Sequence, residues 1–113
     1  MPRVSRREKL QVRLAMEEED LRQTLIPILR SIAAGRNTGF FDMGSGKPTV
    51  LAEPILVKAR DILELATQLG EPNTDLVAAA VLRAFEHAND RTNEHRLGPI
   101  RLARRLIEEV DAP

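Results

Sequence analysis

The sequence predicts an all-α fold: a compact bundle of four to five helices that forms a single domain over residues 1–113. Three observations lead to this class. Leu, Ala, Ile, Arg and Glu dominate the composition, whereas aromatic residues make up only 3%, a mixture that favours helix over strand. Apolar residues recur at intervals of three and four, which is the spacing of one face of a helix. With 42% apolar residues, a chain of this length can also bury one core without disulfides or metals.

The first helix is predicted to begin at Ser5. The run Ser5-Arg6-Arg7-Glu8 has the spacing of a capping box, in which the serine hydroxyl accepts a hydrogen bond from a free amide at the helix start. Residues 1–4 then form a basic N-terminal tail. From Ser5 onward an apolar stripe follows one helical face through Leu10, Leu14, Leu21, Leu25, Ile28 and Ile32.

This stripe has two interruptions. Glu17 falls within the apolar sector and Glu18 lies beside it, so either the helix breaks in the acidic run or a carboxylate lies on the seam between helices. Pro27 is the second interruption, because it lacks the amide that would bond to the preceding turn. We therefore expect one helix to about Thr24 and a second piece over residues 27–34.

Residues 35–50, GRNTGFFDMGSGKPTV, contain four of the six glycines and have no helical period. We expect a glycine-rich loop or a short β-hairpin here. The segment is a poor match to a phosphate-binding loop, because Phe41 stands where the first glycine is required and Pro48 where a hydroxyl would reach magnesium. Phe40 and Phe41 have two interpretations: an anchor that holds the loop to the core, or an exposed docking site for a protein or a stacked base.

Three further helices are predicted, over about residues 54–70, over 74–88 and from Pro99 onward. The second of these is apolar nearly all the way round, which is typical of the middle of a bundle or of an oligomer interface. Val77, Val81 and Phe85 are therefore candidate interaction residues, together with Phe40 and Phe41. In the last helix the pattern directs Leu102, Ala103, Leu106 and Val110 inward and Arg101, Arg104 and Glu108 outward.

Two basic clusters stand out in a chain whose formal net charge is zero. Each has five basic residues and one acid, over residues 1–13 and 91–105. Both lie near predicted helix starts, where an exposed cation forgoes roughly 0.3–1 kcal/mol against the helix dipole. One explanation is phosphate binding, and the other is a solvated face neutralised by pairs such as Arg13–Glu17, Arg104–Glu108 and Arg105–Glu109. The candidate phosphate contacts are Arg3, Arg6, Arg7, Lys9, Arg91, Arg96, Arg101, Arg104 and Arg105.

Catalytic and metal chemistry find little support. Cysteine is absent, and His87 and His95, the only histidines, complete no metal-ligand motif. Glu86-His87 and Glu94-His95 can form acid–base pairs, but nothing in the sequence places a nucleophile or an oxyanion donor near them. We therefore expect no enzymatic activity, no metal and no cofactor. Residues 61–80 fit the frame of a helix-turn-helix, but the second helix offers Asn73, Thr74, Val77 and Ala78 near its start, where base readout requires Arg, Lys, Asn or Gln. No apolar run is long enough for a membrane span and the N-terminus has no export signal, so we expect a cytoplasmic protein without a membrane partner.

Two functions remain open from the sequence. The first is a non-enzymatic helical interaction or assembly module, which either self-associates or is a small subunit of a larger complex. The alternative is a small helical nucleic-acid-binding protein, or the minor subunit of a nucleoprotein complex, which holds backbone phosphates through the two arginine clusters.

Overall fold

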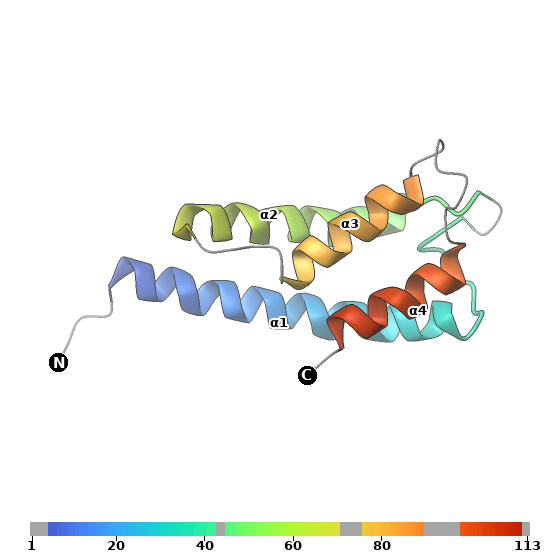
Figure 1. Ribbon diagram of the computed structural model, residues 1–113, viewed down its shortest axis with the longest axis horizontal. Helices are drawn as coiled ribbons and strands as arrows, with labels where there is room; N and C mark the ends of the chain where they lie inside the picture. The colour runs from blue at the N-terminus through green and yellow to red at the C-terminus, as the bar shows by residue number, and fades with distance from the viewer. Residues whose placement is uncertain (1–4, 43–44, 71–75, 90–97, 112–113) are drawn as a thin grey trace.

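The computed structural model describes residues 5–42, 45–70, 76–89 and 98–111. Within these ranges the chain forms four α-helices, α1 (Arg6–Ala33), α2 (Glu53–Leu69), α3 (Val77–Asn89) and α4 (Pro99–Val110), with a short 3₁₀ helix, η1 (Val50–Ala52), before α2. Consecutive helices run in opposite directions, and α1 extends under the other three (Figure 1). Each of α2, α3 and α4 packs against α1. The predicted all-α bundle is confirmed, with four helices in the described residues.

The number of helices is four because α1 is continuous. It begins as predicted at Ser5, whose Oγ accepts a hydrogen bond from the Glu8 amide at 3.1 Å. The predicted break before Pro27 is wrong, since Pro27 lies inside the helix on its exposed side. A proline inside a helix costs roughly 3 kcal/mol. Leu25 and Leu29 on either side are buried, and each buried leucine contributes roughly 1.5–3 kcal/mol, so packing outweighs the lost hydrogen bond.

The segment between α1 and α2 is held to the core by aromatic rings. Phe40 and Phe41 are both buried, and with Phe85 of α3 they form a cluster with ring centroids 5.4–5.5 Å apart. The expected β-hairpin is not formed as such, because the described residues contain no strand and only one isolated antiparallel bridge, between Phe41 and Pro48. The interpretation of the phenylalanines as an anchor is therefore confirmed for both.

The later helices begin and end close to their sequence signals. α2 ends at Gly70, whose left-handed φ of 67° suits glycine and whose amide donates back to the last turn. Gly98 caps α4, with Pro99 in its first turn. The inward residues of α4 are those predicted, since Leu102, Ala103, Leu106 and Val110 are all buried. The proposed caps of α3, Asn73 and Thr74, lie outside the described residues.

The acidic run does not break α1; instead, one of its carboxylates lies at the contact between α1 and α3. Glu18 accepts hydrogen bonds from the backbone amides of Val77, at 2.7 Å, and Ala78, at 3.1 Å. These amides open α3 and have no partner within that helix, so a side chain 59 residues earlier in the chain serves as their acceptor. The negative charge also lies at the positive end of the α3 dipole. Glu18 thus fixes the start of α3 against the middle of α1.

A second polar contact joins α1 to α2. The Lys58 Nζ lies 3.3 Å from Glu17 Oε2 and also hydrogen-bonds to Asp20. The Asp20 hydrogen bond is the main cause that raises the pKa of Lys58 above its usual 10.5, and partial burial of the ammonium acts in the opposite direction. Glu17 and Asp20 of α1 therefore both bind the same lysine of α2.

Replacement of Glu18 by alanine should destabilise the protein by roughly 1–3 kcal/mol, because it leaves two buried amides without an acceptor. Glu18→Gln, which keeps one acceptor oxygen, should lose less. Urea unfolding followed by circular dichroism measures both. The matched control is Glu19→Ala, which removes the same charge from an exposed neighbour and should change the stability by no more than about 0.5 kcal/mol. An equal loss in the two alanine variants would contradict the capping role.

The Lys58 contact predicts a specific pH dependence. Because its pKa is higher in the folded than in the unfolded chain, the contact contributes fully below about pH 10.5 and is lost as the pH rises through the folded-state pKa. Lys58→Met should therefore lower the stability at neutral pH and flatten its decline in alkali. Urea midpoints from about pH 9 to about pH 12 test this. Lys9→Met, a change of the same charge at the exposed start of α1, should keep the wild-type slope.

Candidate functional site

The two predicted basic clusters lie at opposite ends of α1. Arg6, Arg7 and Lys9 are exposed in its first turns. Arg104 of the other cluster donates to the Ala33 carbonyl, at the last residue of the same helix, with a distance of 3.3 Å. A helix rises 1.5 Å per residue, so about 40 Å of α1 separates them. Arg3, Arg91 and Arg96 lie outside the described residues.

Acidic side chains occupy the surface between these two ends. The middle of α1 carries four acids, Glu17, Glu18, Glu19 and Asp20. On the neighbouring α2, Asp61 and Glu64 are exposed. Several of these acids are paired with basic residues there, Glu17 and Asp20 with Lys58 and Glu19 with Arg22. The structure does not combine the two clusters into one phosphate site.

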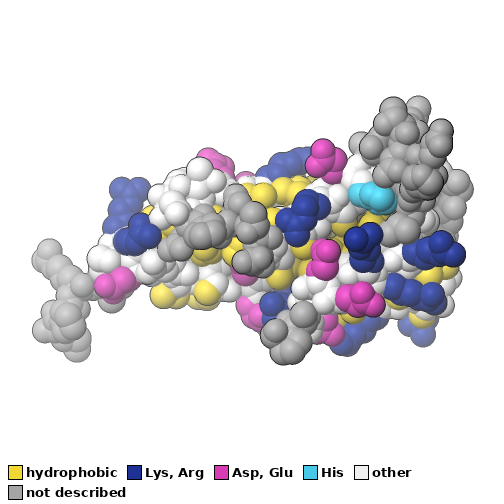
Figure 2. Space-filling model, in the orientation of Figure 1, with side chains coloured by type: hydrophobic (Ala, Val, Ile, Leu, Met, Phe, Trp, Pro, Cys, Tyr) yellow, Lys and Arg dark blue, Asp and Glu magenta, His cyan; other side chains and the backbone are white. Residues whose placement is uncertain are grey.

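The cluster on α4 is instead enlarged by residues from other helices. Lys and Arg side chains gather over α4 and the adjacent end of α1 (Figure 2). Arg30 of α1 lies 3.3 Å from Asp111, just after α4, and Arg83 projects from α3 beside the groove described below. Sequence reasoning missed both. The position of Arg30 in the last turn of its helix was a usable signal, but nothing in the local sequence of Arg83 marks it.

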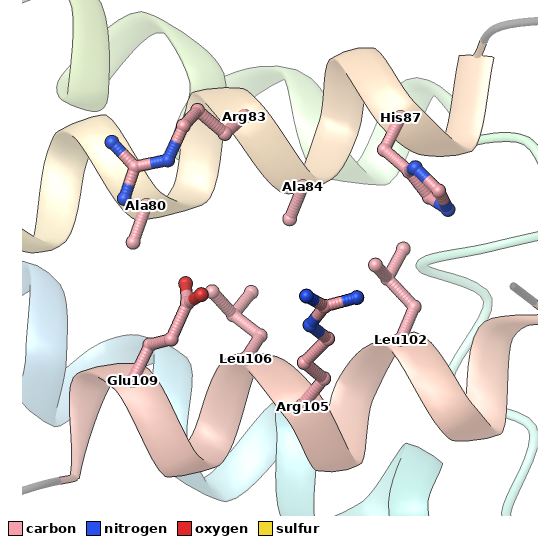
Figure 3. Close-up of a pocket in the computed structure, with 8 residues that line it drawn as sticks. All are labelled: Ala80, Arg83, Ala84, His87, Leu102, Arg105, Leu106 and Glu109. Atoms are coloured by element: carbon pink, nitrogen blue, oxygen red, sulfur yellow. The ribbon is translucent and has the colours of Figure 1, made fainter.

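A groove runs between α3 and α4 over a volume of about 220 Å³. Small-molecule sites usually occupy roughly 300–1,000 Å³, so this groove fits one or two side chains better than a metabolite. Ala80 and Ala84, one turn apart on α3, leave the hollow, and Leu102 and Leu106 of α4 lie opposite them (Figure 3). The charged and polar lining consists of Arg83, His87, Arg105 and Glu109.

The charges beside the groove are of both signs. Arg105 extends from α4 toward α3, and Glu109 follows one turn later on the same helix (Figure 3). The predicted pairs Arg104–Glu108, Arg105–Glu109 and Arg13–Glu17 do not form as ion pairs in the part of the chain that the structure describes. In all three the arginine precedes the glutamate, which is the less favourable order on a helix. Glu17 contacts Lys58 instead.

The predicted interaction residues lie in the core of the single chain. Phe40, Phe41, Val77, Val81 and Phe85 are each at most 6% exposed. They hold the bundle together and offer no surface to a partner in this arrangement. The sequence could not distinguish these locations, because an apolar helix face looks the same whether its neighbour belongs to the same chain or to another.

The helix-turn-helix frame places no reading surface on α3. Val77 and Ala78 at the start of that helix are buried against Glu18 and the core, so neither reaches outward to a base edge. The same described ranges contain no cluster of three metal-ligating side chains. No helix in them has the length and apolar character that a membrane span requires.

Comparison of the chain with protein-family models, with curated proteins and with solved structures found no match in any of the three. The geometry of the α3–α4 surface is therefore the basis for a functional proposal.

Proposed function

We propose that this protein is a non-enzymatic assembly module that binds protein, and in the first place a second copy of itself, through the surface formed by α3 and α4. The observation that carries the proposal is the groove over Ala80 and Ala84, which is lined in equal number by apolar side chains and by charged or polar ones of both signs. Protein interfaces commonly combine a small apolar centre with a polar rim.

The mixture of charges favours a protein over a polyanion. Arg101, Arg104 and Arg105 attract phosphate, but Glu108 and Glu109 lie on the same exposed side of α4 and repel it. A protein partner can place an opposite charge against each of the five residues. Such complementary patterns provide specificity and register between proteins.

Nucleic-acid binding, the other function predicted from the sequence, is less well supported by this surface. The basic clusters are about 40 Å apart along α1, and acidic residues lie between them. Contact through the α4 cluster alone would involve few phosphates. We therefore treat DNA binding as an alternative outcome of the experiment below.

The size of the surface predicts weak association. α4 has 12 residues and α3 has 13, so each is only about 20 Å long. An interface built from these two helices falls near the lower limit of stable complexes, roughly 1,000–1,200 Å² of buried area. We expect an association that depends on concentration and, because its rim is charged, on salt.

Size-exclusion chromatography with light scattering, at low and high salt and over a range of protein concentrations, tests the proposal. The mass should exceed that of one chain, 12.6 kDa, at high concentration and low salt and should fall toward it as salt is added. A single-chain mass under every condition would overturn self-assembly. The same runs with a short DNA duplex or single strand should show no co-elution, and salt-sensitive co-elution would favour the nucleic-acid alternative.

A further inference from the structure

We infer that the second copy docks with its α4 antiparallel to the first α4, so that the arginines of each helix lie against the glutamates of the other. This inference rests on the proposed function and specifies the occupant of the α3–α4 surface. It is carried by the order of charges on the exposed face of α4 and by the absence of ion pairs that would neutralise them within that helix.

The charges of α4 are segregated along its length. Arg101, Arg104 and Arg105 precede Glu108 and Glu109 along the helix, and all five side chains are exposed. The first turn has no acid and the last turn has no base. Arg101, Glu108 and Glu109 therefore have the less favourable sign for their end of the helix dipole.

An antiparallel copy corrects this arrangement. It places the negative end of its own dipole beside the arginines of the first helix and its positive end beside the glutamates. Its glutamates also lie opposite those arginines, and its arginines opposite those glutamates. A parallel copy would instead place arginine against arginine, so the charge pattern selects one of the two orientations.

The positions on the helix agree with a two-fold axis. With a two-fold axis beside α4 at the level of Leu106 and Ile107, residues whose numbers add up to 213 lie at the same height in the two copies, which brings Arg105 level with Glu108 of the second copy. By symmetry each contact occurs twice. Such an interface uses the same surface on both copies and closes on itself, so it gives a dimer and not a fibre.

The groove lies on the α3 side of this contact, beside Arg105. Arg105 and Glu109 border the hollow over Ala80 and Ala84, and the alanine side chains leave space there for long side chains of the second copy (Figure 3). Arg83 on the α3 side adds a further positive group beside the groove. The inner face of α4 is occupied by its own core contacts, so its outer face is the surface open to a partner.

Two charge-reversal variants test the inference in the full chain. The acidic variant carries Arg104→Glu and Arg105→Glu, and the basic variant carries Glu108→Arg and Glu109→Arg. In each variant alone, like charges would meet across the axis, so the dissociation constant of the dimer should rise at least about tenfold. An equimolar mixture should form a heterodimer, because the exposed face of α4 is then acidic in one chain and basic in the other. Analytical ultracentrifugation and native mass spectrometry measure these species.

The control variant is Arg6→Glu with Lys9→Glu, which makes the same change in net charge as the acidic variant, at the far end of α1, and should associate like the wild type. Circular dichroism checks that every variant is helical, and heterodimer formation shows that both reversed chains are competent to bind. If the wild type dimerises but the reversed chains dimerise equally well, or if their mixture gives no heterodimer, the antiparallel α4 contact is wrong while self-assembly stands. If the wild type is a single chain at every concentration, the proposed function itself is wrong.

Discussion

The carboxylate of Glu18 holds the first two amides of α3 against the middle of α1, and the rest of the bundle depends on this contact. It supplies acceptors for amides that have no partner within their own helix, and it brings a charge to a place where an unpaired charge would be costly. Because α3 begins there, Phe85, two turns further on, reaches the rings of Phe40 and Phe41. The same placement of α3 leaves Ala80 and Ala84 facing α4, where they form the groove.

The charged residues of α1 and those of α4 differ in where they find partners. On α1, acids that interrupt an apolar stripe find partners inside the chain, Glu18 at the start of α3 and Glu17 at Lys58. On α4, Arg101 and the two glutamates oppose the helix dipole, and the arginines and glutamates of this helix form no ion pair with one another in the described residues. This charge pattern is unfavourable within the single chain. It is complementary to the same helix in the antiparallel orientation, which is the reason that we propose a second copy as its partner.

The apolar residues, in contrast, are used within the chain. The helix that is apolar nearly all the way round is accounted for by burial between α1, α2 and α4, without an oligomer. The proposed function of the surface therefore depends on a few charged side chains around a small hollow. This is consistent with a weak and adjustable contact, because exposed ion pairs contribute little individually and respond to salt.

The sequence by itself determined the helical class, the start of α1 at Ser5, the ends of α2 and the start of α4, because caps, glycines, prolines and apolar spacing act over a few neighbouring residues. For the acidic run it left two alternatives, a break in the helix or a carboxylate at the contact between helices. Only the tertiary structure decided between these, since the amides that bind Glu18 lie 59 residues away. It likewise decided that α1 continues through Pro27, that the aromatic residues are core and that the two basic clusters lie far apart. Each of these outcomes depends on which helices pack together, a property of the whole chain that no local pattern contains.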